Sequence, residues 1–258
     1  MKKSVGLLLV LALAGCAQTG NYSSSMSGGE APVETEARAR AKVYTELGFA
    51  YFNRAQMKVA LDEARKAIMS DERYGPAYNL LGLIYMELEE DKLAEENFRK
   101  SIDMERSYPE AYNNYGWFLC TRGRYDEGLS QFIEAMRNPL YDKPEQAMTN
   151  AGLCSEKKGD LKQAESYYNK ALKLQPNAPQ AVVKLANLNF RKGDLNEAQR
   201  LLTRFQEISP PTAESLWLSL LIERRLGDKG QEGFYNQQLR KRFPDSPETK
   251  LLLQGQYE

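Results

Sequence analysis

One position recurs six times at an almost fixed interval along this chain, and in five of the six it holds glycine or alanine. This spacing limits the fold more than any other feature. We call this recurring position the slot. Successive slots lie 34 residues apart, with one step of 36 after the third slot. The slot is occupied by Gly48, Gly82, Gly116, Gly152, Ala186 and Leu220. A regular period of this length predicts similar structural units stacked in chain order, because no unit can bury its apolar face alone.

The residues around this slot repeat as well. An aromatic or apolar residue stands four places before it, at Tyr44, Tyr78, Tyr112, Met148, Val182 and Leu216. A small residue stands twelve places after it in five of the six units, at Ala60, Ala94, Gly128, Ala164 and Ala198. Small residues at both positions let two helices cross closely. The pattern therefore predicts a pair of packed helices in each unit.

This pattern resembles the tetratricopeptide repeat, a helix-turn-helix unit of 34 residues. The resemblance implies an all-α fold, a right-handed superhelical solenoid of six repeats. We expect the repeats at about 41–74, 75–108, 109–142, 145–178, 179–212 and 213–246. Glycines seven places after the slot are predicted to end first helices, and prolines to close the last three units. They are Gly123, Gly159, Gly193 and Gly227, and Pro176, Pro210 and Pro244.

The step of 36 falls at residues 137–144, where two extra residues and two prolines lengthen the connection between the third and fourth units. Two interpretations remain open. The insertion is either a surface feature without consequence or a local change in the pitch of the superhelix.

The N-terminus has the features of an exported protein. Lys2 and Lys3 precede an uncharged apolar run over 5–14, which predicts a signal peptide over residues 1–15. The ending Leu13-Ala14-Gly15-Cys16 resembles the bacterial lipobox, which implies that Cys16 becomes the lipidated N-terminus. An ordinary secretory signal with an incidental cysteine is the alternative. Residues 16–36 are rich in serine and glycine and predict a flexible tether with a reach of roughly 25 Å, so the repeat domain is expected over 37–258.

Charge and composition exclude several classes of function. Lysine plus arginine equals aspartate plus glutamate at 35 each, so no net field favours nucleic acid. The chain has no histidine, which removes the commonest general base and the commonest metal ligand. The acidic run over 87–91 is interpreted as a solvated turn rather than a metal site. We expect no enzymatic activity, metal, cofactor or small-molecule substrate.

Repeats of this kind present a concave surface formed by the first helix of each pair. By analogy with the family, residues one and four places after the slot point into it, and in the first three units all six are apolar. Asparagines three places before the slot add amides able to hold an extended backbone. We therefore predict an apolar groove over 42–121 that takes a partner segment; packing of these side chains against neighbouring repeats is the alternative. The predicted groove residues are Phe49, Phe52, Asn79, Leu83, Met86, Asn113 and Trp117.

Two cysteines remain besides Cys16. Cys120 and Cys154 fall on the first helices of the third and fourth units, and export places them in an oxidising compartment. Cys120 stands four places after its slot and Cys154 two places after its slot. The two-residue insertion between their units either compensates this offset or does not. A disulfide and a pair of buried apolar thiols are therefore both retained.

Three stretches extend the resemblance beyond the repeat itself: NNYGWFLC at 113–120, NAGLC at 150–154 and SLWL at 215–218 with IERRLGD at 222–228. With the lipobox, they resemble the PilW/PilF family of type IV pilus biogenesis lipoproteins. That resemblance implies a pilotin, palmitoylated and anchored on the periplasmic face of the outer membrane through Cys16. Its partner would be the pilus secretin, which it escorts to the outer membrane for multimerisation and twitching motility. The alternative is a repeat scaffold lipoprotein of another envelope machine, such as β-barrel assembly.

Overall fold

The computed structural model describes residues 35–257, and every regular element in this part of the chain is an α-helix. The predicted signal peptide, Cys16 and most of the predicted tether lie outside the described residues. None of the described helices has the length and apolar character needed to cross a membrane. The helices are α1 (Glu36–Phe52), α2 (Met57–Ser70), α3 (Gly75–Glu87), α4 (Asp91–Met104), α5 (Pro109–Thr121), α6 (Tyr125–Arg137), α7 (Pro144–Lys158), α8 (Leu161–Leu174), α9 (Pro179–Lys192), α10 (Leu195–Ile208), α11 (Ala213–Leu226), α12 (Lys229–Arg242) and α13 (Pro247–Leu253).

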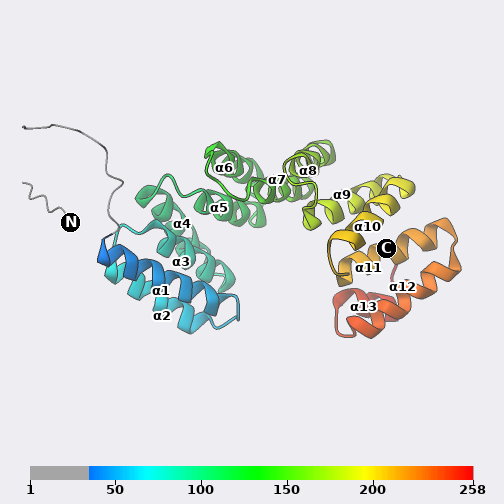
Figure 1. Ribbon diagram of the computed structural model, residues 1–258, viewed down its shortest axis with the longest axis horizontal. Coiled ribbons are helices and arrows are strands. Elements are labelled where there is room, and N and C mark those ends of the chain that lie inside the picture. The colour runs from blue at the N-terminus through cyan, green and yellow to red at the C-terminus, as the bar shows by residue number, and fades with distance from the viewer. Residues whose placement is uncertain (1–34, 258) are drawn as a thin grey trace, which may run out of the picture. The chain divides into compact units, whose positions relative to one another are not determined.

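The first twelve helices form six pairs in chain order (Figure 1). The two helices of a pair pack on each other, and each pair contacts the pair that follows. The first helices of successive pairs, from α1 to α11, also contact one another. The predicted solenoid of six tetratricopeptide repeats is therefore confirmed.

The close approach of the two helices in a pair depends on the slot residue of the first helix. At Gly82 in α3, a Cβ atom would lie only 2.6 Å from the ring of Phe98 in α4. The small partner residue Ala94 is fully buried at the same crossing. The missing side chain at Gly82 and the small one at Ala94 let the two helices approach closely, as the sequence pattern predicted.

Three of the first helices end at the predicted glycines. The first helices α7, α9 and α11 each end in a glycine with a positive φ, and an aspartate side chain then accepts a backbone N–H of the following helix. These glycines are Gly159, Gly193 and Gly227, and the aspartates are Asp160, Asp194 and Asp228. Each turn thus satisfies backbone groups on both of the helices that it joins.

The insertion between the third and fourth pairs is an ordered turn. The Asn138 side chain accepts the N–H of Leu140 and donates to the Ser107 carbonyl in the preceding connection. Tyr141 is buried beside Ala135 of α6 and Ala147 of α7. The extra residues therefore add an aromatic contact between two repeats as well as the exposed Leu140.

The two ends of the array differ from the predicted boundaries. The first helix begins at Glu36, ahead of the repeat expected at 41, because Thr35 caps it by accepting the N–H of Arg38. Beyond the sixth pair, where the sequence analysis named no repeat, α13 packs on α11 and α12. A capping serine, Ser246, followed by Pro247 is the sequence signal for this helix.

Candidate binding groove

The apolar residues predicted for the groove in the first two units are half-buried. Phe49 and Phe52 pack against the core between the first and second pairs. Leu83 and Met86 pack against the next cluster, which contains Phe98. Each of these side chains therefore contributes to inter-repeat packing and keeps part of its surface exposed. The packing interpretation holds for all four, and binding of a partner by their exposed parts stays a prediction.

The predicted asparagines form a chain of hydrogen bonds inside the array. Asn79 Nδ2 donates to the Tyr108 hydroxyl at 3.4 Å, and Asn79 Oδ1 accepts from Asn114 Nδ2 at 3.1 Å. Asn113 Nδ2 donates to Asn114 Oδ1 at 3.4 Å, and Asn113 Oδ1 accepts from Asn150 Nδ2 at 3.1 Å. The chain therefore connects the first helices of the second, third and fourth pairs.

This chain corrects the expectation for Asn79. Its side chain is fully buried and both of its polar atoms are used within the protein, so it does not face a partner. Asn113 is also buried and uses both polar atoms internally. Burial raises the pKa of Tyr108, with a further contribution from the Glu110 carboxylate, which keeps the phenol at the end of the chain neutral.

The structure forms a groove of about 770 Å³ on the first helices of the third to sixth pairs. Its walls come from α5, α7, α9 and α11, with α10 and the connection before α11 contributing at one end. The lining residues are Asn113, Asn114, Trp117, Gln146, Asn150, Leu153, Pro179, Gln180, Val183, Lys184, Phe205, Ser209, Thr212 and Glu214. Only Asn113 and Trp117 were predicted, because this groove lies mostly beyond the expected range of 42–121.

Many of the lining residues occupy equivalent places in successive repeats. The sequence analysis did not use this regularity. Asn114, Asn150 and Lys184 all stand two places before the slot of their units, while Trp117 and Leu153 stand one place after it. The sequence analysis selected lining residues mainly by apolar character. Following each position through all six units would have placed the groove further along the chain.

The groove carries little net charge. Lys184 Nζ and Glu214 Oε1 are its two charged groups among the lining residues, and they form an ion pair at 2.5 Å. The remaining polar lining is made of carboxamides and hydroxyls, and Val183 and Phe205 are the buried apolar part. Such a surface is suited to a neutral polypeptide rather than a charged ligand.

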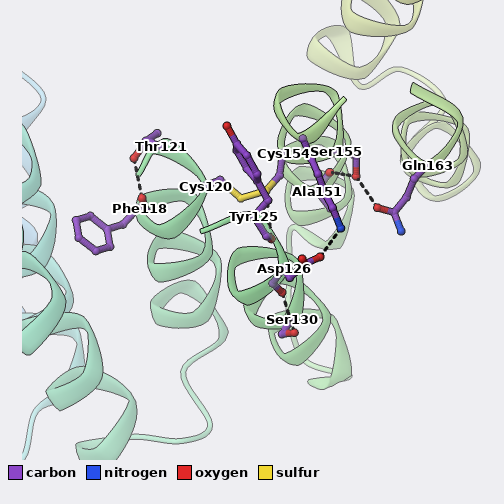
Figure 2. The surroundings of a disulfide bond; sticks show 11 residues. Phe118, Cys120, Thr121, Tyr125, Asp126, Ser130, Ala151, Cys154, Ser155 and Gln163 are labelled. Carbon is purple, nitrogen blue, oxygen red and sulfur yellow. Dashed lines mark hydrogen bonds and ion pairs between the residues drawn. A yellow bond between two sulfur atoms is a disulfide. The ribbon is translucent and has the colours of Figure 1, made fainter. Parts of the chain in front are cut away.

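A disulfide joins two of the helices that line the groove. Cys120 in α5 and Cys154 in α7 are joined, with their Cα atoms 5.6 Å apart (Figure 2). The half-buried Trp117 packs on the cluster that contains both cysteines and Phe132. The covalent bond therefore fixes the third pair to the fourth within the cluster on which Trp117 packs.

The described part of the chain offers no grouping of three His, Cys, Asp or Glu side chains suited to a metal ion. What the groove presents instead is amide donors and acceptors beside apolar side chains. This is the chemistry of polypeptide recognition.

Comparison with known proteins agrees with this architecture. Three models described as tetratricopeptide repeat match the chain, over residues 75–108, 119–179 and 157–220. These matches fall on the second to sixth helix pairs. Arrays of such repeats form extended binding surfaces for other molecules.

Two relatives are similar over almost the whole chain. The type IV pilus assembly protein PilF of Pseudomonas aeruginosa is 28% identical over 250 residues, which is 96% of each chain. Its solved structure gives a TM-score of 0.72 at 27% identity and covers 86% of this chain and 100% of that one. The crystal structure of PilW, a widely conserved type IV pilus biogenesis factor, gives a TM-score of 0.72 at 31% identity and covers 83% of this chain and 98% of that one. The chain therefore belongs to the PilF and PilW family of type IV pilus biogenesis proteins built from tetratricopeptide repeats.

Proposed function

We propose that this protein is a pilotin, an outer-membrane lipoprotein that binds subunits of the pilus secretin and promotes their localisation and multimerisation. The observation that carries this proposal is the family membership, since similarity to PilF extends over 96% of the chain. The lipobox-like Leu13-Ala14-Gly15-Cys16 supports the anchor.

The parts of the chain would divide this work. Acyl chains on Cys16 hold the protein on the periplasmic face of the outer membrane, where several chains are needed for stable attachment. The serine- and glycine-rich stretch after it gives reach. The helix pairs supply the protein-binding surface, and half-buried residues such as Phe52 and Met86 offer apolar contacts to a secretin segment before it pairs with other subunits.

No catalytic step is part of this proposal. The sequence lacks histidine, and the groove is lined by amides and apolar groups. Activity would consist of binding, placement and release of a protein partner. The lipid determines where the protein acts, and the repeats determine what it binds.

The test is membrane fractionation in the native bacterium, with secretin followed by immunoblot in unboiled samples to detect heat-resistant multimers. Three strains are compared with wild type: one lacking the protein, one with Cys16→Ala and one with Ala17→Asp. The first removes all functions and the second removes the anchor. Ala17 follows the predicted lipidated cysteine. By analogy with other bacterial lipoproteins, an aspartate at this position retains the protein in the inner membrane, so Ala17→Asp is expected to keep the lipid but change the destination.

We expect secretin multimers to vanish from the outer membrane in all three strains. In the Ala17→Asp strain, secretin is expected to follow the protein to the inner membrane, which separates anchoring from addressing. Unchanged location and multimers of secretin in the deletion strain would contradict the proposal. The protein would then be a scaffold for a different envelope partner.

A further inference from the structure

A large apolar side chain is exposed at or near the end of the second helix in each of the first four pairs. Met69 lies in the last turn of α2, and Met104 and Leu174 are the last residues of α4 and α8. Leu140 lies in the connection from α6 to α7. Leu140 and Met69 are 89% and 83% exposed, the highest values for large apolar side chains among residues 35–257. Exposed apolar side chains gathered at one structural position indicate a contact surface.

These four side chains lie on one edge of the array. The two helices of a pair pack together and are joined by a short turn, so each second helix ends beside the start of its own first helix. Arg38, at the start of α1, bonds to Asp71 at 3.3 Å and to Glu105 at 2.6 Å, just after α2 and α4. Asn138 bonds in turn to the Ser107 carbonyl. Successive connections between pairs therefore adjoin one another, beginning at the N-terminal end of α1.

The opposite edge, formed by the turns within the pairs, has a different character. Ion pairs link its successive turns, and they join Arg122 with Asp91, Lys158 with Asp126 and Lys192 with Glu165. Leu88 and Leu226 at these turns are less exposed than Met69 and Leu140. Contact with lipid would remove water from the charges of this edge. The edge with the exposed apolar side chains is thus the one suited to a lipid surface.

The predicted tether joins the repeat domain at this same apolar edge. Residues 17–34, which are 18 residues, separate Cys16 from Thr35 at the start of α1. A flexible chain of this length reaches roughly 23 Å. The opposite edge is further from the anchor by the length of a 14-residue helix such as α2, about 21 Å. An anchored molecule would therefore hold its apolar edge near the bilayer at a high effective concentration.

The charges near the first three connections almost cancel. Exposed cations and anions occur there in equal number, and these are Arg73, Arg106 and Lys143 against Glu72, Asp103 and Asp142. Attraction to anionic lipid is consequently small. The apolar side chains would supply most of the attraction, and the long arginine and lysine side chains can extend their charged ends to the headgroups.

We propose that this edge, formed by the connections between the first repeats, rests on the lipid surface that holds the acyl chains of Cys16, with Met69 and Leu140 inserted among the headgroups. The proposal rests on the anchor proposed for Cys16 and goes beyond it, because it assigns the side of the array that touches the membrane. The groove is formed by helix faces rather than by this edge, so it stays open to a partner.

The probe is a vesicle of phosphatidylethanolamine and phosphatidylglycerol that carries the full protein as the bacterium matures it. An environment-sensitive fluorophore is attached at Met69→Cys, at Leu140→Cys or, as the matched control on the opposite edge, at Leu88→Cys. The introduced thiol is the only reactive one, since Cys120 and Cys154 are joined and acylation occupies Cys16. All three labelled positions are exposed, so the label does not disturb the core.

We expect the emission from Met69→Cys and Leu140→Cys to shift to shorter wavelength on reconstitution and to be quenched by spin-labelled lipid. The fluorophore at Leu88→Cys should stay in water and be quenched by iodide instead. Replacement of phosphatidylglycerol by phosphatidylcholine should change neither result, because the edge carries little net charge.

A second reporter tests whether the apolar side chains cause the contact. The fluorophore is placed at Arg106→Cys, an exposed position on the same edge. Adding Met69→Gln and Leu140→Gln is expected to reduce its quenching by lipid about 3- to 10-fold, since two apolar side chains no longer leave water. Adding Leu88→Gln and Leu226→Gln instead should leave the quenching unchanged. Circular dichroism of each variant checks that its helices remain folded.

Three results with acylated protein would overturn the proposal. They are labels at Met69→Cys and Leu140→Cys as exposed to water as the label at Leu88→Cys, quenching at Arg106→Cys that survives loss of both apolar side chains, and a contact that requires phosphatidylglycerol. Mass spectrometry of the purified protein separates these failures from failure of the proposed function. An acylated protein with its labels in water contradicts the orientation alone and leaves secretin assembly standing, whereas a chain without acyl groups on Cys16 overturns the anchor and this proposal with it.

Discussion

Gly82 shows how a single residue determines the distance between the two helices of a repeat. A Cβ atom at this position would lie 2.6 to 2.9 Å from three ring atoms of Phe98. Phe98 is fully buried against Tyr115 and Phe118, so its ring has little room to move. We expect Gly82→Ala to lower the free energy of unfolding by about 1–3 kcal/mol, measured by urea denaturation.

A matched glycine in α12 supplies the control. A Cβ atom at Gly233 would meet no heavy atom within 4 Å. Gly233→Ala should therefore raise stability by about 0.5–1 kcal/mol, since alanine loses less backbone entropy in a helix. Equal effects at Gly82 and Gly233 would show that helix propensity, not the crossing with Phe98, dominates.

The residue seven places after the slot adopts a backbone conformation that its residue type does not always predict. Four units have glycine there, and all four adopt a positive φ. In the first two units the same place holds Ala55 and Glu89, with φ of 56° and 60°. The turn geometry is therefore kept without glycine. The backbone reveals this, whereas the residue type alone predicts the turn in only four units.

A glycine should relieve this turn in the second unit. The left-handed conformation costs a residue with a side chain about 1–2 kcal/mol. Replacing it with glycine removes this cost, but the greater entropy of glycine in the unfolded chain offsets part of the gain. We expect Glu89→Gly to raise the free energy of unfolding by about 0.5–1 kcal/mol. Glu87→Gly, two residues earlier in the last turn of α3, is the control and should lower it. Thermal and urea unfolding of both variants test the difference in sign.

At the scale of the helices, Glu95 links three elements through its carboxylate. It accepts hydrogen bonds from Arg99 at 2.6 Å, from the Tyr115 hydroxyl at 2.8 Å and from Arg124 at 2.8 Å. Arg124 directly precedes α6, and Tyr115 lies in α5. Burial favours a higher pKa, but Arg124, Tyr115 and Arg99 outweigh it and lower the pKa of Glu95. The ion pairs therefore stabilise the folded state when the carboxylate is charged.

This link predicts a defined pH dependence. As pH falls below the ordinary range for glutamate, the unfolded chain binds a proton at this position before the folded chain does, so stability is lost until pH passes the lowered pKa. We expect Glu95→Gln to cost about 1–2 kcal/mol at neutral pH and progressively less as pH decreases. Glu96→Gln, at the exposed neighbouring position, is the control. A pH-independent difference between wild type and Glu95→Gln would contradict the assignment.

The helices themselves were largely predictable, and α13 shows where prediction stopped. The pairs follow from a period that repeats six times, so each unit supports the interpretation of the others. The short helix α13 has no such support, because it belongs to no complete repeat. Its Ser246 cap, which accepts the N–H of Thr249, was visible but isolated.

At the scale of the whole chain, the groove was harder to predict than the fold. Fold class depends on contacts within a repeat, which a periodic pattern contains. The groove depends on side chains from four helices meeting at one surface, and on which asparagines are used internally. Asn79 and Asn114 have the same chemistry, yet one is fully buried and the other lines the groove. The difference is their place in the repeat: Asn79 stands three residues before the slot in α3, and Asn114 stands two residues before the slot in α5.

The disulfide determines how the array unfolds. In a repeat array each pair is stabilised by its neighbours alone, so a weak boundary can divide unfolding into two transitions. The bond from Cys120 to Cys154 spans the boundary between the third and fourth pairs and closes a loop with a sequence separation of 34. A loop of this size is worth about 3–4 kcal/mol by the entropy that the bond removes from the unfolded chain. It also brings two parts of the array into one cooperative unit.

We therefore expect the double variant Cys120→Ala, Cys154→Ala to unfold at lower urea concentration, with a broader or divided transition. Wild type in excess dithiothreitol should behave like this variant, and the variant itself should not respond to the reductant. Cys16→Ala is the matched control, since it removes the one cysteine that takes no part in this bond and should leave the transition unchanged. If reduced wild type unfolds in the same single transition as the oxidised protein, the packing around Tyr141 and Trp117, rather than the disulfide, joins the third pair to the fourth.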